Sequence, residues 1–527
     1  MDPLLANGDY KTPNQNGYIM KKKWTEVVGQ RLTMPSHRIG VLYLITCMLF
    51  LIVGMAAALL IQLDMLNPLS QLAGPKWFEA LLTGHGMLMI FLVLLPIFPG
   101  VFGHTVFLSA IGANELPWPI VRFLGWMCHA VGGGLIIVAL SMGAYDGGWT
   151  MMLPVAGGHH TWFTVLIIGL LLAALSVSLP SAAIVRAFLS RRFHATPAPQ
   201  LSLLAWFFFL GALAQVLITP IRLITLAFLF GGHNWEWTYL MTSNSDGIAR
   251  YLLAFWMYTG PATLSLLVPS IGILFEIVSS SRGEATHERT LLVGAGLIFV
   301  ALSLASFGQH LVSAIGYETM FLTGALLGLL ALLPLTVLVI RWLRLWQLMR
   351  NPFPAVDFFA LVAIVCGLFA VLTAVAMSIP ALTQYLHSTY FSVAHLHFSA
   401  FGFIGGVVLA GLSQFWTNSS PPVYVRTGLK ASSIGFLVGM LFSFVPMLIM
   451  GSLGLPKSIV SYPSQYQILH TLSTAGSIVL AVSVLLGMLL LIMNAIRPDV
   501  AASDTEALSG GLKYRFLLWR NIKERGI

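Results

Sequence analysis

The sequence predicts an all-α integral membrane protein with about twelve transmembrane helices. Of its 527 residues, 57% are hydrophobic and only 9% are charged, a balance that does not suit a soluble domain with a polar surface. Apolar runs long enough to cross a bilayer, each about 20 residues or more, recur along the chain. Lys and Arg gather in alternate connections between these runs, as they do in proteins that cross a membrane repeatedly.

The apolar runs define the expected helices in chain order, and each is long enough to span about 30 Å of hydrocarbon at about 1.5 Å per residue. They cover residues 39–63, 78–103, 118–144, 160–190, 201–231, 248–279, 290–314, 317–345, 357–383, 388–417, 430–452 and 465–497. We therefore expect a membrane domain at 34–497. A polar arm at 1–33 precedes it and a tail at 498–527 follows it.

The charge pattern predicts the orientation of the helices. Lys and Arg cluster at residues 21–23, 191–192, 341–350, 426–430 and 520–525, and such clusters face the cytoplasm. An even number of helices then returns both termini to the cytoplasm. The net charge of +9 is explained by this topology and gives no reason to expect nucleic-acid binding.

Three histidines lie within predicted helices: His85, His395 and His397. With the predicted orientation, His85 lies roughly 10 Å below the outer end of its helix, and the other two lie roughly 10 to 14 Å below theirs. All three are expected in one layer. Residues two apart on a helix point about 200° away from each other, so His395 and His397 face opposite sides.

A single histidine in a membrane helix is more often a packing residue than a ligand. Three at one depth, two of them in an H-x-H motif, favour ligands to heme iron, for which imidazole is a common axial ligand. The simplest arrangement has His85 and His397 on either side of one iron, with His395 on a second. A C-x-x-C-H motif is absent, which excludes covalently attached heme.

Several motifs give the chain a family resemblance, among them SHRIGVLYL at 36–44, HGMLMIFLVLLP at 85–96, IGANELPWP at 111–119 and STYFSVAHLHFSAFG at 388–402. Over about residues 33–493 the chain resembles subunit I of the heme-copper oxidase superfamily. The resemblance implies a twelve-helix bundle in the bacterial inner membrane, working with other subunits of a respiratory complex. It also implies that His85 and His397 bind a low-spin heme and that His395 binds a high-spin heme.

The chain departs from the family where copper would bind. The family's sixth-helix motif G-H-P-E-V-Y supplies a copper ligand, a carboxylate and a tyrosine, and those positions are Gly260, Ala262 and Leu264 here. The seventh helix carries Gln309 and His310 in place of two adjacent histidines. A single imidazole with an amide is a poor copper site, so no copper is expected. The ligand set that nitric oxide reductases use for non-heme iron is missing as well.

Proton-conducting positions differ too. The lysine of the family's P-T-G-I-K motif falls at Leu338, and the aspartate of its G-A-x-D-M loop falls near Asn114, with Glu115 beside it. The helix interiors offer almost no other titratable groups, so proton pathways are expected to be lost. Gln62 stands where the family has an arginine that contacts the formyl group of a-type heme, which favours two b-type hemes.

Two further residues are candidate heme contacts. Lys457 falls where the family binds heme propionates. His310 stands where the missing copper would have faced the second heme, so it is a candidate distal ligand of that iron.

The sequence thus favours a heme-binding electron-transfer subunit that does not reduce oxygen to water, with a periplasmic donor or acceptor protein or quinol as partner. One alternative is a copper-free terminal oxidase or nitric oxide reductase with an open heme. Another is a structural pseudo-subunit of a respiratory complex. Heme, metal and gas-binding measurements distinguish the three.

Overall fold

The computed structural model describes the membrane-embedded part of the chain. Its described residues are 34–69, 74–144, 148–151, 161–190, 201–235, 237, 239, 245–280, 288–347, 355–416 and 421–495. Within these ranges regular structure is helical, apart from an isolated bridge between Thr389 and Pro456. Twelve helices there are long and apolar enough to cross a membrane, which confirms the predicted fold class. The predicted arm at 1–33 and tail at 498–527 lie outside the described residues.

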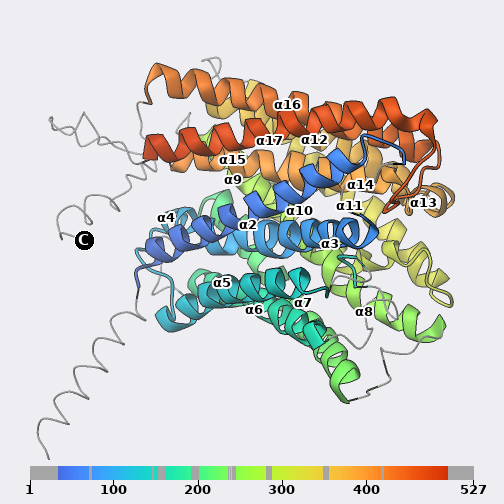
Figure 1. Ribbon diagram of the computed structural model, residues 1–527. Helices are drawn as coiled ribbons and strands as arrows, with labels where there is room; N and C mark the ends of the chain where they lie inside the picture. Colours follow the sequence, from blue (N-terminus) through green and yellow to red (C-terminus); the bar gives the residue numbers. More distant parts are fainter. Residues whose placement is uncertain are drawn as a thin grey trace, which may run out of the picture.

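The first six crossings run from blue to yellow-green in Figure 1. They comprise α2 (Ser36–Asp64); α3 (Gly74–Met87) with the π-helical segments η1 (Leu88–Leu94) and η2 (Ile97–Phe102); α5 (Pro119–Ser141); α6 (Thr161–Leu189); α7 (Leu203–Trp235); and the broken pair α8 (Ser245–Leu264) and α9 (Leu267–Ser280). The short α4 (Val106–Ala110) follows the second crossing.

The other six crossings complete the bundle. They comprise α10 (Arg289–Ala305) with the 3-10 turn η6 (Ser306–His310); α11 (Glu318–Gln347); α12 (Ala355–Ser378); α14 (Tyr390–Leu396), π-helical η7 (His397–Gly405) and α15 (Gly406–Phe415); α16 (Val423–Ser452); and η8 (Ser464–Tyr466) with α17 (Gln467–Ala495). The short α13 (Pro380–Leu386) lies between α12 and α14.

Several predicted boundaries are wrong: α16 begins at Val423, before the predicted 430, and α7 continues to Trp235, beyond the predicted 231. Three others have a local reason. The second crossing begins at Gly74, four residues before the predicted start, because its first turn carries polar residues. The run predicted at 290–314 leaves α-helical geometry after Ala305, where η6 packs closely on α11. The run predicted at 357–383 is interrupted at Ile379, because Pro380 cannot continue the backbone hydrogen bonding of α12.

Small residues allow neighbouring helices to approach closely. A Cβ atom at Gly132 of α5 would lie 2.9 Å from the carbonyl oxygen of Gly169 on α6. A Cβ atom at Gly439 of α16 would lie 2.6 Å from the backbone nitrogen of Leu480 on α17. Because apolar side chains gain little from leaving lipid for a helix interface, close packing of this kind holds membrane helices together.

The first described helix and the last one meet at the same end of the bundle. In Figure 1, α2 (blue) begins and α17 (red) ends at the left of the view. This arrangement follows from an even number of crossings. That this end faces the cytoplasm remains a prediction of the charge pattern.

Candidate heme-binding site

His85 and His397 lie opposite each other across the bundle interior. His85 is near the end of α3 and His397 is the first residue of η7. Their ring centroids are 5.9 Å apart and their planes differ by only 2°. Two imidazoles that bind one metal ion from opposite sides, each through a bond of about 2 Å, have centroids about 6 Å apart. The pair therefore has the spacing that two axial ligands of one iron require.

Hydrogen bonds occupy Nδ1 of both histidines and leave Nε2 of each ring available to bind a metal ion. Nδ1 of His85 lies 3.0 Å from the carbonyl oxygen of Gly54 on α2, and Nδ1 of His397 lies 2.8 Å from that of Val393. A carbonyl oxygen only accepts, so Nδ1 carries the proton in each ring and Nε2 keeps its lone pair. Metal-bound histidines use this arrangement to fix their tautomer.

His395 faces away from the His85–His397 pair. Its Nδ1 lies 2.8 Å from Oγ1 of Thr373 on α12. That hydroxyl donates its own proton to the carbonyl oxygen of Phe369, 2.7 Å away, so it accepts from His395. Nε2 of His395 is again the nitrogen left for a metal. His397 thus faces α3 while His395 faces α12, as the two-residue spacing predicts.

The depth predicted for His85 along its own helix is wrong, because α3 begins at Gly74. The residue lies about 16 Å from that start, whereas His397 lies about 11 Å from the start of α14 at Tyr390. The two rings are nevertheless in one layer, since their centroids are only 5.9 Å apart.

π-Helical turns accompany both members of the pair. η1 begins three residues after His85, and η7 begins at His397 itself. A π turn holds one more residue than an α turn and rotates the side chains that follow it, and such segments are frequent at functional sites. Periodicity in the sequence gave no sign of either segment.

Gly260, Gln309 and His310 are neighbours in space, so the positions that the resemblance assigns to copper ligands do come together. A Cβ atom at Gly260 would lie 3.4 Å from Cδ2 and 3.6 Å from Nε2 of His310. Nε2 of Gln309 lies 3.3 Å from Nε2 of His310. Trp256 stacks on the His310 ring, with centroids 4.1 Å apart and planes at 21°.

These neighbours offer one imidazole and one amide to a metal. In the described part of the chain, no group of three or more His, Cys, Asp or Glu residues lies close enough together to hold a metal ion. Such a donor set does not fit copper, which needs several nitrogen or sulfur ligands in fixed geometry. The His310 ring also lies near that of His387, with centroids 6.3 Å apart.

Lys457 lies in the connection between α16 and η8, near the start of α14. Its Nζ donates to the carbonyl oxygen of His387 at 3.0 Å and to Oγ of Ser392 at 3.4 Å. Burial lowers the pKa of Lys457. Burial, with the charge of Lys457 beside it, lowers the pKa of His387 to about 4. The next residue, Ser458, has a φ of 61°, a strained backbone conformation for a residue other than glycine.

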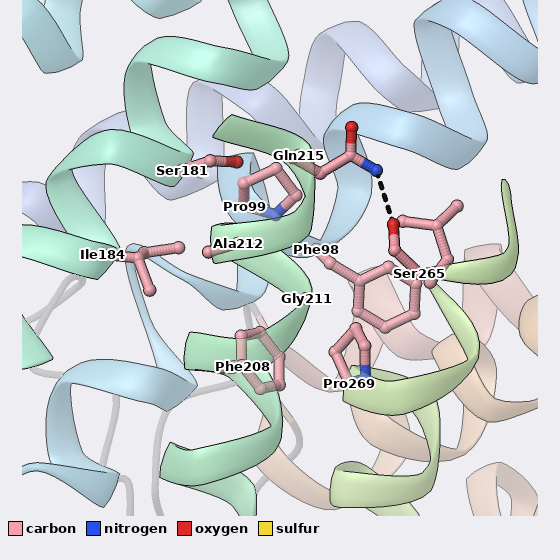
Figure 2. A pocket seen from close by; sticks show the side chains of 11 residues that line it. Phe98, Pro99, Ser181, Ile184, Phe208, Gly211, Ala212, Gln215, Ser265 and Pro269 are labelled. Atoms are coloured by element: carbon pink, nitrogen blue, oxygen red, sulfur yellow. Dashed lines mark hydrogen bonds between the residues drawn. The ribbon is translucent and has the colours of Figure 1, made fainter. Parts of the chain in front are cut away.

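The sixth crossing breaks just after Ala262, where the resemblance expects a carboxylate. α8 ends at Leu264 and α9 begins at Leu267, which leaves the carbonyl oxygen of Ala262 free of a helical bond. Nε2 of Gln215 on α7 donates to that oxygen at 2.9 Å and to Oγ of Ser265 at 2.8 Å. Figure 2 shows the Gln215–Ser265 bond beside a cavity of about 10 Å³, room for one water molecule.

The Glu115 carboxylate is hydrogen-bonded to Arg122 and Ser36. Its Oε2 accepts from Nη1 of Arg122 at 2.8 Å and from the backbone nitrogen and hydroxyl of Ser36 at 2.9 and 2.7 Å. The carboxylate thereby provides an acceptor for the amide of Ser36 in the first turn of α2, where amides have no helical partner. Leu338, at the family's lysine position, is fully buried among apolar residues.

The helix interiors hold more polar groups than the sequence analysis expects. Tyr43 lies between the rings of His104 and His129, with centroids 5.9 and 5.3 Å away, and all three are buried. Arg222 is buried on α7. The expectation that these interiors are almost free of titratable groups is wrong, because long apolar runs conceal single polar residues that face the protein.

Comparison with known proteins places the chain in a family. The family model for cytochrome c and quinol oxidase polypeptide I matches residues 38–479. The chain belongs to this family. Cytochrome c oxidase subunit 1 of Thermostichus vulcanus is 23% identical over 452 residues, covering 85% of this chain and 81% of the relative. That of Synechocystis sp. is 25% identical over 473 residues, covering 88% and 84%.

A solved structure supports the same fold. A heme-copper terminal oxidase dimer determined by cryo-EM superposes with a TM-score of 0.73 at 16% identity, covering 89% of this chain and 86% of that chain. The protein is therefore a subunit I-like heme-copper oxidase homologue, and with its twelve apolar helices it is a multi-pass protein of the bacterial inner membrane. The family implies heme cofactors, respiratory electron transport and a multi-subunit complex.

Two residues of interest escaped the sequence analysis. Thr373 carries no motif, and only its contact with His395 distinguishes it from other threonines in apolar helices. Arg222 could have been noticed in the sequence. Placing an arginine inside the apolar run at 201–231 costs free energy, and such residues usually have a function.

Proposed function

We propose that this chain is a heme-binding electron-transfer subunit that does not reduce oxygen to water. It binds two hemes, b-type in preference to a-type, and no copper. The observation that carries the proposal is the His85–His397 pair, with parallel rings 5.9 Å apart and both Nδ1 atoms held by carbonyl oxygens.

In this proposal His85 and His397 would hold the first heme through their Nε2 atoms. A heme held there would supply one-electron redox chemistry. The carbonyl oxygens of Gly54 and Val393 fix the ring tautomers and orientations. Phe444 packs on His397, with centroids 4.4 Å apart, and restricts movement of that ring.

His395, whose ring is oriented by Thr373, would hold the second heme together with His310. The position facing this iron lacks the donors for copper, since Gly260 has no side chain and Gln309 supplies an amide. The Lys457 ammonium is partly buried beside a carbonyl and a hydroxyl, and a heme propionate would supply an anion to pair with it.

The electron partner is another subunit of a membrane respiratory complex, a periplasmic donor or acceptor protein, or quinol. If the charge pattern gives the orientation correctly, the three histidines lie in the outer half of the membrane. Electrons would then enter or leave near the periplasmic face.

Heme and metal contents of the purified protein test this function. We expect about two hemes per chain, extractable as non-covalent heme b, and no copper above background. H85A is expected to lose the first heme, while H233A, which replaces a histidine near the end of α7, should keep both. A chain that purifies with stoichiometric copper, or without heme, would show the proposal to be wrong.

One observation favours the alternative of an open second heme. Nε2 of His310 lies 3.3 Å from the Gln309 amide and can accept its proton. If His310 keeps that hydrogen bond, the iron on His395 stays five-coordinate and can bind oxygen or nitric oxide. Oxygen uptake by the purified complex, abolished by H395A, would favour a copper-free oxidase.

A further inference from the structure

Arg222 is a cation enclosed in the middle of the bundle. It lies within α7, a crossing helix, and its side chain is only 2% exposed. Nη1 and Nη2 have no hydrogen-bond partner in the described part of the chain. Most buried guanidinium groups are paired with a carboxylate or with several carbonyl oxygens, so this one is unusual.

Aromatic rings surround the guanidinium. Its Cζ lies 4.6 Å from the ring centroid of Phe91, 5.4 Å from that of Tyr258 and 5.9 Å from that of Phe255. In the described part of the chain, no ion pair joins this guanidinium to a carboxylate. Cation–π contacts offset part of the cost of burial but leave the net positive charge in place.

Neighbours of Arg222 connect it with both groups of proposed heme ligands. Phe91, the nearest ring, belongs to η1, six residues beyond His85 in the same crossing. On the other side Phe255 packs against Trp256, with centroids 5.1 Å apart, and Trp256 stacks on His310. Two rings, those of Phe255 and Trp256, therefore connect Arg222 with His310, and its nearest ring, Phe91, lies in the same crossing as His85.

A fixed charge in such surroundings acts over a long distance. Water and salt screen exposed charges within about 10 Å, whereas a buried charge in a low-dielectric interior is screened much less. Reduction of ferric heme adds one electron and no other charge to the site. A nearby cation stabilises that added electron and so raises the reduction potential.

We propose that Arg222 sets the reduction potentials of the bound hemes as a buried, uncompensated positive charge. This role rests on the proposed function, because it requires heme at His85–His397 and at His395. Arg222 acts through space and coordinates no iron. Tyr251, Tyr258 and Phe255 of α8 and Phe91 of η1 hold the cation in position without neutralising it.

Potentiometric titration of the heme spectra in the purified complex tests the proposal. R222M removes the charge at similar side-chain length, and R222Q is a second neutral variant. Arg250 is the matched control, since it is also an arginine over an aromatic ring, Tyr239, at 5.1 Å, but is only partly buried. We expect both Arg222 variants to lower both midpoint potentials, at low and at high salt, while R250Q changes neither.

Heme content measured on the same samples separates the two proposals. Wild-type protein without heme refutes the proposed function itself. Variants that keep their heme with unchanged or raised potentials refute the role of Arg222 alone. Loss of heme from both Arg222 variants also contradicts this role, because the proposal gives Arg222 no part in heme retention.

Discussion

The hydrogen bond between Thr373 and His395 provides a sharp test of the second heme site. T373V replaces the hydroxyl by a methyl group of nearly the same volume, so it removes the acceptor of the 2.8 Å bond without opening a cavity. Nδ1 of His395 then loses its partner, and the ring is free to change tautomer or orientation. Loss of such an outer-shell partner weakens metal binding about 10- to 100-fold, or about 1.4 to 2.7 kcal/mol.

Transfer of heme to an excess of apomyoglobin measures this loss. We expect the T373V protein to release the heme on His395 about 10- to 100-fold faster than wild type, and to release the His85–His397 heme at the wild-type rate. T373S, which keeps the hydroxyl, is the matched control. Equal release rates for T373V and T373S, or equal acceleration for both hemes, would refute the assignment of Thr373 and His395 to one site.

Three further variants test other parts of the structure. H397A removes one axial ligand and should abolish the six-coordinate spectrum of the first heme while the second heme stays; survival of that spectrum contradicts the pairing. G260H/Q309H gathers three imidazoles with His310 and should bind about one copper ion per chain, with His310 leaving the second iron for copper, whereas a folded variant without copper would disprove the neighbourhood inferred there. E115Q weakens the bonds to α2 and should destabilise the protein by about 1–2 kcal/mol, seen as a lower midpoint of thermal unfolding with unchanged heme content; an unaltered midpoint contradicts its structural role.

The helical architecture could be predicted because its signal is compositional. Twelve apolar runs appear in the sequence, and the same number of long apolar helices appears among the described residues. Local geometry was less predictable. The break between Leu264 and Leu267 and the π turn at His397 depend on contacts with other helices, and an apolar run has the same composition with or without them.

For the candidate site, too, some residues could be predicted from the sequence and their geometry could not. His85, His395 and His397 stood out because histidine is rare in apolar helices and their depths could be compared. The geometry of the His85–His397 pair needed three dimensions, since η7 and α3 are more than three hundred residues apart in the chain. Thr373 and Arg222 were missed because their roles depend on which rings they face, and residue order does not encode that directly.

The carbon monoxide difference spectrum of the reduced, purified protein tests the central claim most directly. If His310 and His395 both bind the second iron, as His85 and His397 bind the first, no iron has an open position. The spectrum should then show no carbon monoxide adduct. A stoichiometric high-spin adduct would contradict this account and favour a gas-binding enzyme.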